Sequence, residues 1–168
     1  MDRLWSPWRS QYIDTFNDNK ESDICIFCNK IEADIKDKSN LIVFKGRLSY
    51  IVLNLYPYNS GHLMIVPYRH NNDFTKMSDE ENLEIMKNLQ LSVKALEIAM
   101  SPHGYNLGAN LGRVSGAGID QHIHFHIVPR WNGDINFMPV IGEVKVISQD
   151  LLETKSKLIE AFNKIALS

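Results

Sequence analysis

Hydrophobic and polar residues alternate in short blocks along much of the chain, and turn-forming residues separate the blocks. Lys45-Gly46-Arg47 lies between two of them, and the sequence Tyr-Pro-Tyr-Asn-Ser-Gly at residues 56–61 lies between the next two. Apolar runs of this length, bounded by Gly, Pro and Asn, are typical of strands joined by tight turns. Strands are therefore expected at residues 41–44, 48–55, 62–66, 105–111 and 121–128.

Two longer segments have helical periodicity instead. Ser78 and Glu81 have the spacing of a capping box, with Ser78 as the N-cap. The apolar residues that follow recur every three or four positions and predict one buried stripe, made of Leu83, Met86, Leu89, Val93, Leu96 and Met100. Residues 148–167 carry the same spacing, and a short helix is expected at residues 29–36. Together these elements predict an α+β fold: a mainly antiparallel sheet of about five strands, one long helix and a C-terminal helix.

The bulk properties narrow the class of protein. A chain of 168 residues has the length of a single domain, here expected to span residues 1–168. The formal net charge of −2 offers no broad basic surface, which argues against a nucleic acid polymer as partner. The sequence shows neither a signal peptide nor an apolar run of membrane-spanning length, so no membrane partner is expected and the cytoplasm is the expected location.

Three histidines alternate with apolar residues at positions 122–126, in the sequence His-Ile-His-Phe-His. In a strand, His122, His124 and His126 would line one face about 6.5–7 Å apart, while Ile123 and Phe125 would face the core. A core strand would place apolar residues on that histidine face, and a solvated strand would place Lys, Thr or Glu there. The pattern leaves two functional interpretations open: a metal site, or an imidazole nucleophile held by its neighbours.

The two cysteines, Cys25 and Cys28, form a C-x-x-C pair. A structural disulfide is not expected between such close cysteines in a reducing compartment, and no strand leads into the pair as in a thioredoxin-like motif. Half of a zinc site is the better interpretation, provided that two further ligands exist. His70, which ends a strand-like run, and His122 would complete a Cys₂His₂ set that suits tetrahedral zinc.

A glycine-rich connection, Ser115-Gly116-Ala117-Gly118, precedes the histidines. Glycine lets the backbone approach an anion, and unpaired amides in such a turn can hold phosphate. The spacing matches neither a Walker loop nor a dinucleotide-binding fingerprint, which argues against ATPase and dehydrogenase functions. A hairpin connection without a function is the alternative.

The run His-Ile-His-Phe-His-Ile-Val at residues 122–128 resembles the signature of the histidine-triad (HIT) superfamily of nucleotide hydrolases and transferases. Other segments follow in the superfamily's order: the cysteine pair, Asn54 at a strand end, Gly-His-Leu-Met-Ile-Val-Pro at 61–67, and the long helix. The resemblance covers residues 25–131 and implies a HIT-like domain with extensions at both ends. Residues 4–9 and 130–139 are similar to the bacterial diadenosine tetraphosphate phosphorylase-like branch, which implies dinucleoside polyphosphates as substrates.

The resemblance also implies roles for single residues. His124 would attack the α-phosphorus of a nucleotide and form a covalent nucleotidyl-histidine, which water or inorganic phosphate then resolves. His126, as a charged imidazole, would help to bind the phosphate. Asn54 would take the ribose hydroxyls, and the loop with Ser115, Gly116 and Gly118 would meet the phosphates. Cys25, Cys28, His70 and His122 would hold a structural zinc.

One departure from the family pattern bears on the leaving group. Many relatives have a glutamine four residues before the first triad histidine, where this chain has Gly118, and Gln121 lies directly beside His122 instead. Gln121 is counted among the substrate-binding residues, but the choice between hydrolysis and phosphorolysis stays open. A nucleoside phosphoramidate or acyl-adenylate hydrolase, and a non-catalytic nucleotide-binding protein, are the alternatives. Members of the superfamily are commonly homodimers, so a homodimer is expected, in which the aromatic N-terminus and the 131–139 loop could reach the neighbouring site.

Overall fold

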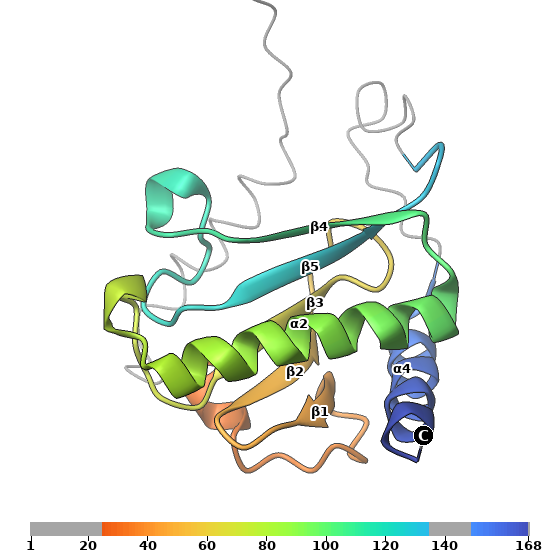
Figure 1. The fold of residues 1–168 in the computed structure, drawn as a ribbon, viewed down its shortest axis with the longest axis horizontal. Helices are drawn as coiled ribbons and strands as arrows, with labels where there is room; N and C mark the ends of the chain where they lie inside the picture. The colour runs from red at the N-terminus through yellow and green to blue at the C-terminus, as the bar shows by residue number, and fades with distance from the viewer. Residues whose placement is uncertain (1–24, 135–148, 168) are drawn as a thin grey trace, which may run out of the picture.

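The computed structural model describes residues 25–134 and 149–167, and five strands in this part form one antiparallel sheet (Figure 1). The sheet order is β1-β2-β3-β5-β4. The strands are β1 (Ile42–Lys45), β2 (Ser49–Leu53), β3 (Leu63–Pro67), β4 (Gly104–Ala109) and β5 (Phe125–Arg130). The predicted α+β class with a mainly antiparallel sheet is therefore confirmed. The aromatic N-terminal segment and residues 135–139 lie outside the described residues.

In the described part of the chain two α-helices accompany the sheet, α2 (Asp79–Met100) and α4 (Leu151–Ala166), with 3₁₀ turns at η1 (Cys28–Lys30), η2 (Phe74–Lys76) and η3 (Arg113–Ser115). Within the described ranges, none of the helices is both long and apolar enough to cross a membrane. The prediction of a helix at residues 29–36 is wrong beyond η1. The carboxylates of Asp34 and Asp37 accept hydrogen bonds from the amides of Lys36 and Ser39, and such local bonds compete with helix formation.

The start of α2 follows the sequence prediction, but its buried face does not. The Ser78 side chain accepts from the Glu81 amide and the Glu81 carboxylate accepts from the Ser78 amide, which completes the capping box. Leu83 and Met86, expected in the core, are 57% and 56% exposed. The helix instead buries a face that includes two polar residues, and its buried members are Glu81, Ile85, Asn88, Leu89, Ser92, Ala95 and Leu96.

Asn88 and Ser92 are tolerated inside because both side chains have partners. The Asn88 amide donates to Ser49 Oγ over 2.9 Å, and the Ser92 hydroxyl donates to the Asn88 carbonyl over 2.7 Å. A buried polar group that keeps its hydrogen bonds avoids most of the cost of leaving water. Apolar spacing alone could not reveal this, so the predicted stripe was rotated away from the true core.

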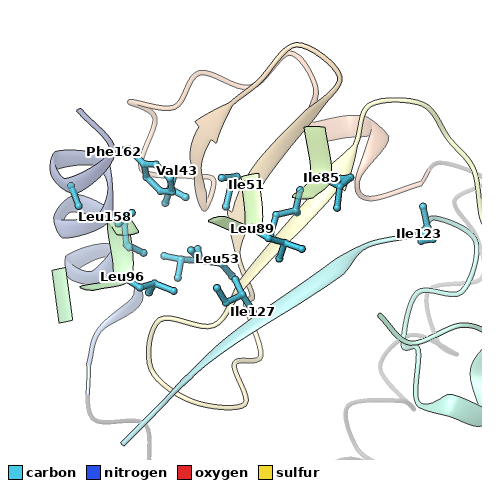
Figure 2. Close-up of a cluster of buried hydrophobic side chains, with 14 of the residues drawn as sticks. Val43, Ile51, Leu53, Ile85, Leu89, Leu96, Ile123, Ile127, Leu158 and Phe162 are labelled. Carbon is cyan, nitrogen blue, oxygen red and sulfur yellow. The ribbon is translucent and has the colours of Figure 1, made fainter. Parts of the chain in front are cut away.

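Alternate residues of the strands serve two different faces of the sheet. Val43, Ile51, Leu53 and Ile127 pack with Leu89 and Leu96 of α2 and with Leu158 and Phe162 of α4 (Figure 2). The opposite face carries a second cluster, formed by Phe27, Ile42, Tyr50, Val52, Met64 and Val66. His126 pairs with Met64 across β3 and β5, so His126 belongs to this second face. Both helices thus brace one face and leave the other for the site.

The histidine strand begins later and ends later than predicted. His122 and His124 precede β5, and only His126 lies within it. Pro129, expected to end the strand, pairs with Tyr105 inside it. The proline is accepted because β5 runs beyond its last pairing with β3, at Leu63, and the Pro129 carbonyl accepts from the Asn59 side chain instead.

Candidate functional site

A pocket of about 460 Å³ lies on the second face of the sheet. Its floor includes Val52 and Met64, and His124 and His126 also line it. Further walls come from the η1 segment, from residues 110–119 and from the start of α4. The sheet supplies rigid support, while loops supply most of the rim, as is usual for ligand sites.

His124 has a fixed ring orientation and a defined tautomer. Its Nδ1 lies 2.9 Å from the carbonyl oxygen of His122. A carbonyl can only accept, so Nδ1 carries the proton and the lone pair is on Nε2. No residue in the described ranges hydrogen-bonds Nε2. The Phe27 ring packs at 5.1 Å, and burial lowers the pKa of His124, so the imidazole is neutral and its Nε2 is available as a nucleophile.

His122 faces away from this chemistry. Its Nε2 lies 2.9 Å from the carbonyl of Pro67, so Nε2 carries the proton and Nδ1 carries the lone pair. That Nδ1 lies 3.3 Å from the Cys25 sulfur and 3.6 Å from the Cys28 sulfur. Burial lowers the pKa of His122 to about 4, which keeps the ring in the neutral form that a metal requires.

The four residues expected to bind metal do converge. One ligand atom from each of Cys25, Cys28, His70 and His122 lies within 4.8 Å of all the others. His70 Nδ1 is 3.4 Å from the Cys28 sulfur. A tetrahedral centre with the usual zinc bond lengths separates sulfur from nitrogen by about 3.5 Å, and the observed separations agree with that value. The donor set and its spacing therefore fit a tetrahedral metal ion.

His126 is held by a buried histidine that the sequence alone left without a role. His62 Nδ1 accepts from the Tyr58 amide over 3.0 Å and lies 3.3 Å from the Asn54 amide nitrogen. His62 Nε2 therefore carries the proton and donates to His126 Nδ1 over 2.9 Å. The proton of His126 is consequently on Nε2, a buried atom without a partner among the described residues.

The charge expected on His126 differs from what the structure favours. Burial lowers the pKa of His126 to about 4, so its imidazole is neutral near pH 7. A neutral imidazole with its proton on Nε2 still provides one hydrogen-bond donor. The group that meets a phosphate oxygen here is then an uncharged donor rather than a cation.

The residues expected to bind substrate fall into two groups. Asn54, Gly116 and Gly118 line the pocket together with the histidines. The Asn54 side chain is already engaged, because its oxygen accepts from the Tyr56 amide and its nitrogen approaches His62. Ser115 and Gln121 do not line the pocket; the Ser115 hydroxyl donates to backbone carbonyls of its own loop, and Gln121 is exposed.

Other lining residues were not singled out from the sequence, among them Lys30, Tyr58 and Asn110. The Tyr58 ring is tilted against the His62 ring at a centroid distance of 4.6 Å and stacks on the His126 ring at 5.8 Å. Its place in a turn between two strands gave no sign of this contact. The arrangement brings together a neutral imidazole with an available lone pair, a neutral hydrogen-bond donor and a glycine-lined wall, groups that could serve transfer of a phosphoryl or nucleotidyl group.

Comparison with known proteins agrees with this chemistry. An AP-4-A phosphorylase of Mycobacterium tuberculosis is 39% identical over 161 residues, which cover 94% of this chain and 83% of the relative. The adenosine 5′-monophosphoramidase hnt1 of Schizosaccharomyces pombe is 32% identical over 108 residues, or 64% of this chain and 75% of the relative.

Solved structures share the fold. A zinc-bound histidine triad family protein from Mycobacterium smegmatis matches with a TM-score of 0.68 and 23% identity, covering 85% of this chain and 96% of that protein. A uridylyltransferase matches with a TM-score of 0.68 and 20% identity, covering 94% of this chain and 51% of that protein. The sequence model of the HIT domain matches residues 36–133, more than half of the chain. The chain therefore belongs to the HIT domain family, as its three alternating histidines predict.

Proposed function

We propose that this protein cleaves dinucleoside polyphosphates such as diadenosine tetraphosphate at the α-phosphate, through a covalent intermediate on His124. The observation that carries the proposal is the hydrogen bond from His124 Nδ1 to the His122 carbonyl, which leaves the Nε2 lone pair at the pocket. The 39% identity to an AP-4-A phosphorylase supports this choice of substrate.

The reaction has two steps, formation and breakdown of the covalent intermediate. The lone pair of His124 Nε2 forms a bond to the α-phosphorus, and the bond from that phosphorus to the bridging oxygen breaks, so that ATP leaves and AMP stays on the imidazole. An oxygen of inorganic phosphate or water then attacks the same phosphorus, and the bond to His124 breaks. Phosphate as acceptor gives ADP, and water gives AMP. A neutral imidazole suits the first step because it needs no separate base.

His126 stabilises the charge that develops in both steps. Its Nε2 proton, oriented by the bond from His62, donates to a phosphate oxygen or to the departing bridging oxygen. The backbone around Gly116 and Gly118 lies against the polyphosphate, since both glycines line the same pocket. Asn54 lies beside the ribose and also holds His62 in its tautomer.

Cys25, Cys28, His70 and His122 would hold a structural zinc ion. With four protein ligands the ion would have no open position for water or substrate, so it would brace the fold. The ion would fix His122, whose carbonyl in turn orients His124. Two free thiols suit a reducing compartment, which supports a location in the cytoplasm.

A second copy of the chain is the expected protein partner. Among the described strands β4 is the last on its side of the sheet, and Leu107 on this strand is 54% exposed. An unpaired edge with apolar side chains is a surface that proteins usually cover, here by the equivalent strand of a homodimer. Light scattering of the full chain tests this, and a monomer at all concentrations would contradict it.

Phosphorus NMR of the full chain with diadenosine tetraphosphate, with and without inorganic phosphate, tests the proposed reaction. ADP plus ATP identifies phosphorolysis, and AMP plus ATP identifies hydrolysis. A parallel reaction with adenosine 5′-phosphoramidate examines the activity that the hnt1 relative is named for. Turnover of the phosphoramidate together with inert diadenosine tetraphosphate would replace the proposed substrate class with the second one.

A further inference from the structure

One wall of the pocket is assembled from three separate segments: the η1 turn, residues 39–41 and the first turn of α4. Its apolar members are Leu41, Leu151 and Leu152. The ammonium of Lys155 on α4 donates to the carbonyls of Asp37 and Asn40 over 2.8 and 2.9 Å, so the loop and the helix form one fixed wall. A rigid apolar wall of this kind suits the flat faces of a nucleobase.

Lys30 adds a cation to this wall, whose other polar lining residue is Ser39. It is the one lysine or arginine among the described residues that line the pocket, and it is partly buried. Its ammonium makes no hydrogen bond or ion pair with any residue in the ranges 25–134 and 149–167. The carboxylate of Asp37, on the neighbouring loop, is occupied by the amide and hydroxyl of Ser39. A partly buried ammonium without a protein acceptor gains most from a ligand that brings one.

We infer that the Lys30 ammonium donates hydrogen bonds to the acceptor atoms on the edge of a purine base, and that it thereby gives the pocket a preference for 6-oxopurines. The inference rests on the proposed nucleotide substrate and names its base. A lysine ammonium is only a donor. Guanine and hypoxanthine present two adjacent acceptors, O6 and N7, whereas adenine presents N7 beside an amino group that is itself a donor. Guanosine-containing dinucleoside polyphosphates are therefore bound more tightly than the adenosine compound.

Calorimetric titration of the full chain with AMP, GMP and IMP tests the assignment without requiring turnover. IMP keeps O6 and N7 but lacks the 2-amino group, so it isolates the edge that Lys30 contacts. The wild-type protein is expected to bind GMP and IMP more tightly than AMP, and tighter binding of AMP would contradict the assignment. Lys30→Met keeps the length of the side chain and is expected to weaken GMP and IMP about tenfold and AMP about threefold or less.

Two further variants sharpen the test. Lys30→Gln is expected to favour AMP over GMP, because a glutamine amide pairs with the N6 and N7 of adenine. Lys87→Met, on the exposed face of α2 and outside the pocket, is expected to change none of the three affinities. Thermal unfolding of each variant confirms that it is folded, and Lys30→Gln carries the test if Lys30→Met is not.

Each result of these titrations either supports or overturns the role assigned to Lys30. An equal loss for all three nucleotides in Lys30→Met would place the ammonium on the phosphate and overturn the assignment. Unchanged affinities, or a wild-type protein that binds none of the three, would overturn it as well. A base preference that depends on Lys30 in a protein that cleaves no dinucleoside polyphosphate would keep the assignment and remove the proposed reaction.

Discussion

His62 donates a hydrogen bond from Nε2 to His126 Nδ1 over 2.9 Å, and this bond determines which nitrogen of His126 carries the proton. The direction of the bond is set one step further back, because the Tyr58 amide donates to His62 Nδ1 over 3.0 Å. An amide N–H can only donate a hydrogen bond. The chain of hydrogen bonds from Tyr58 through His62 to His126 therefore has one consistent arrangement of protons. The last proton in it, on His126 Nε2, is buried and lies at the pocket.

Replacing His62 should therefore lower the rate without removing nucleotide binding. His62→Phe fills a similar volume but cannot donate to His126 Nδ1, so the proton of His126 is no longer confined to Nε2. We expect kcat for diadenosine tetraphosphate to fall about 10- to 100-fold, as for other residues that orient a catalytic group, while KM changes less than threefold.

His62→Gln provides the matched test, because its amide can donate to His126. It should recover part of the lost kcat in steady-state assays. A purely structural role would be indicated if both variants lost thermal stability and activity in equal measure, with no difference between Phe and Gln.

Replacing His124, the proposed nucleophile, should lower kcat more than replacing His62. His124→Ala removes the lone pair that forms the bond to phosphorus, so kcat should fall at least about 1000-fold while the protein still binds AMP. His103→Ala, at an exposed histidine whose Nδ1 only accepts from the Asn132 amide, should keep full activity. Mass spectrometry of the wild-type protein quenched during turnover should find an added nucleotidyl group that His124→Ala lacks. Full turnover by His124→Ala would exclude the mechanism.

Metal removal should affect stability before chemistry. A chelator removes the ion, and Cys28→Ser removes one of the four ligands that the cluster with Cys25, His70 and His122 offers; either should lower the thermal midpoint. Elemental analysis should find about one zinc ion per wild-type chain and much less in Cys28→Ser. Residual activity below the melting transition is expected, since the ion touches no reacting atom. Complete loss of activity in a metal-free protein with an unchanged melting temperature would instead make the metal catalytic.

The sheet and the long helix could be predicted from the sequence because their signals are local. Alternation and turn residues placed the strands within a few positions, and Ser78 with Glu81 placed the start of α2. The buried side of α2 could not be read in the same way. Asn88 lies inside because of its bond to the distant Ser49, and Ser92 because its hydroxyl bonds the helix backbone; neither bond leaves a signal in the apolar spacing.

In the functional site, too, only the residues with a local signal in the sequence could be predicted. The spacing of His122, His124 and His126 pointed to one patch, and the chemistry of the cysteine pair pointed to His70 as a metal partner. The partner of His126 could not be predicted, because His62 reaches it only through the pairing of β3 with β5. Lys30 was missed for a similar reason: it enters the pocket only when η1 folds across the second face of the sheet.

The turn after β5 should make the fold sensitive to acid. The Arg130 guanidinium holds the pKa of Asp134 at about 2, below its ordinary value of 3.8, through bonds of 2.6 and 2.9 Å. A carboxylate whose pKa is lower in the folded than in the unfolded state stabilises the fold fully above pH 3.8. That contribution is lost as the pH falls towards 2.

Asp134→Asn removes this linkage. Its free energy of unfolding should be lower than that of the wild type near pH 7, and the difference should shrink between pH 4 and pH 2 in urea titrations. Glu97→Gln, on the exposed face of α2, should show no such convergence. A constant difference between Asp134→Asn and wild type at every pH would assign the loss to packing rather than to the charge.

Lys155 joins α4 to the loop before β1, and its ammonium keeps hydrogen-bond partners although the residue is only 4% exposed. Its ammonium donates to two backbone carbonyls over 2.8 and 2.9 Å and approaches the Asn40 side-chain oxygen at 3.4 Å. Lys155→Met keeps the aliphatic stem and removes the donors, leaving those carbonyls without this partner. We expect a loss of about 2 kcal/mol in the free energy of unfolding, or about 5 °C in the melting temperature.

Lys164→Met, at an exposed position on the same helix, should change the melting temperature by less than about 2 °C. Because Leu151 and Leu152 of α4 line the pocket, Lys155→Met should also raise KM for the dinucleotide several-fold while kcat changes little. A buried methionine that proved as stable as the lysine would mean that desolvation of the ammonium cancels its three bonds. In that case apolar packing of α4 against β1 and α2 would be enough to hold the wall of the pocket.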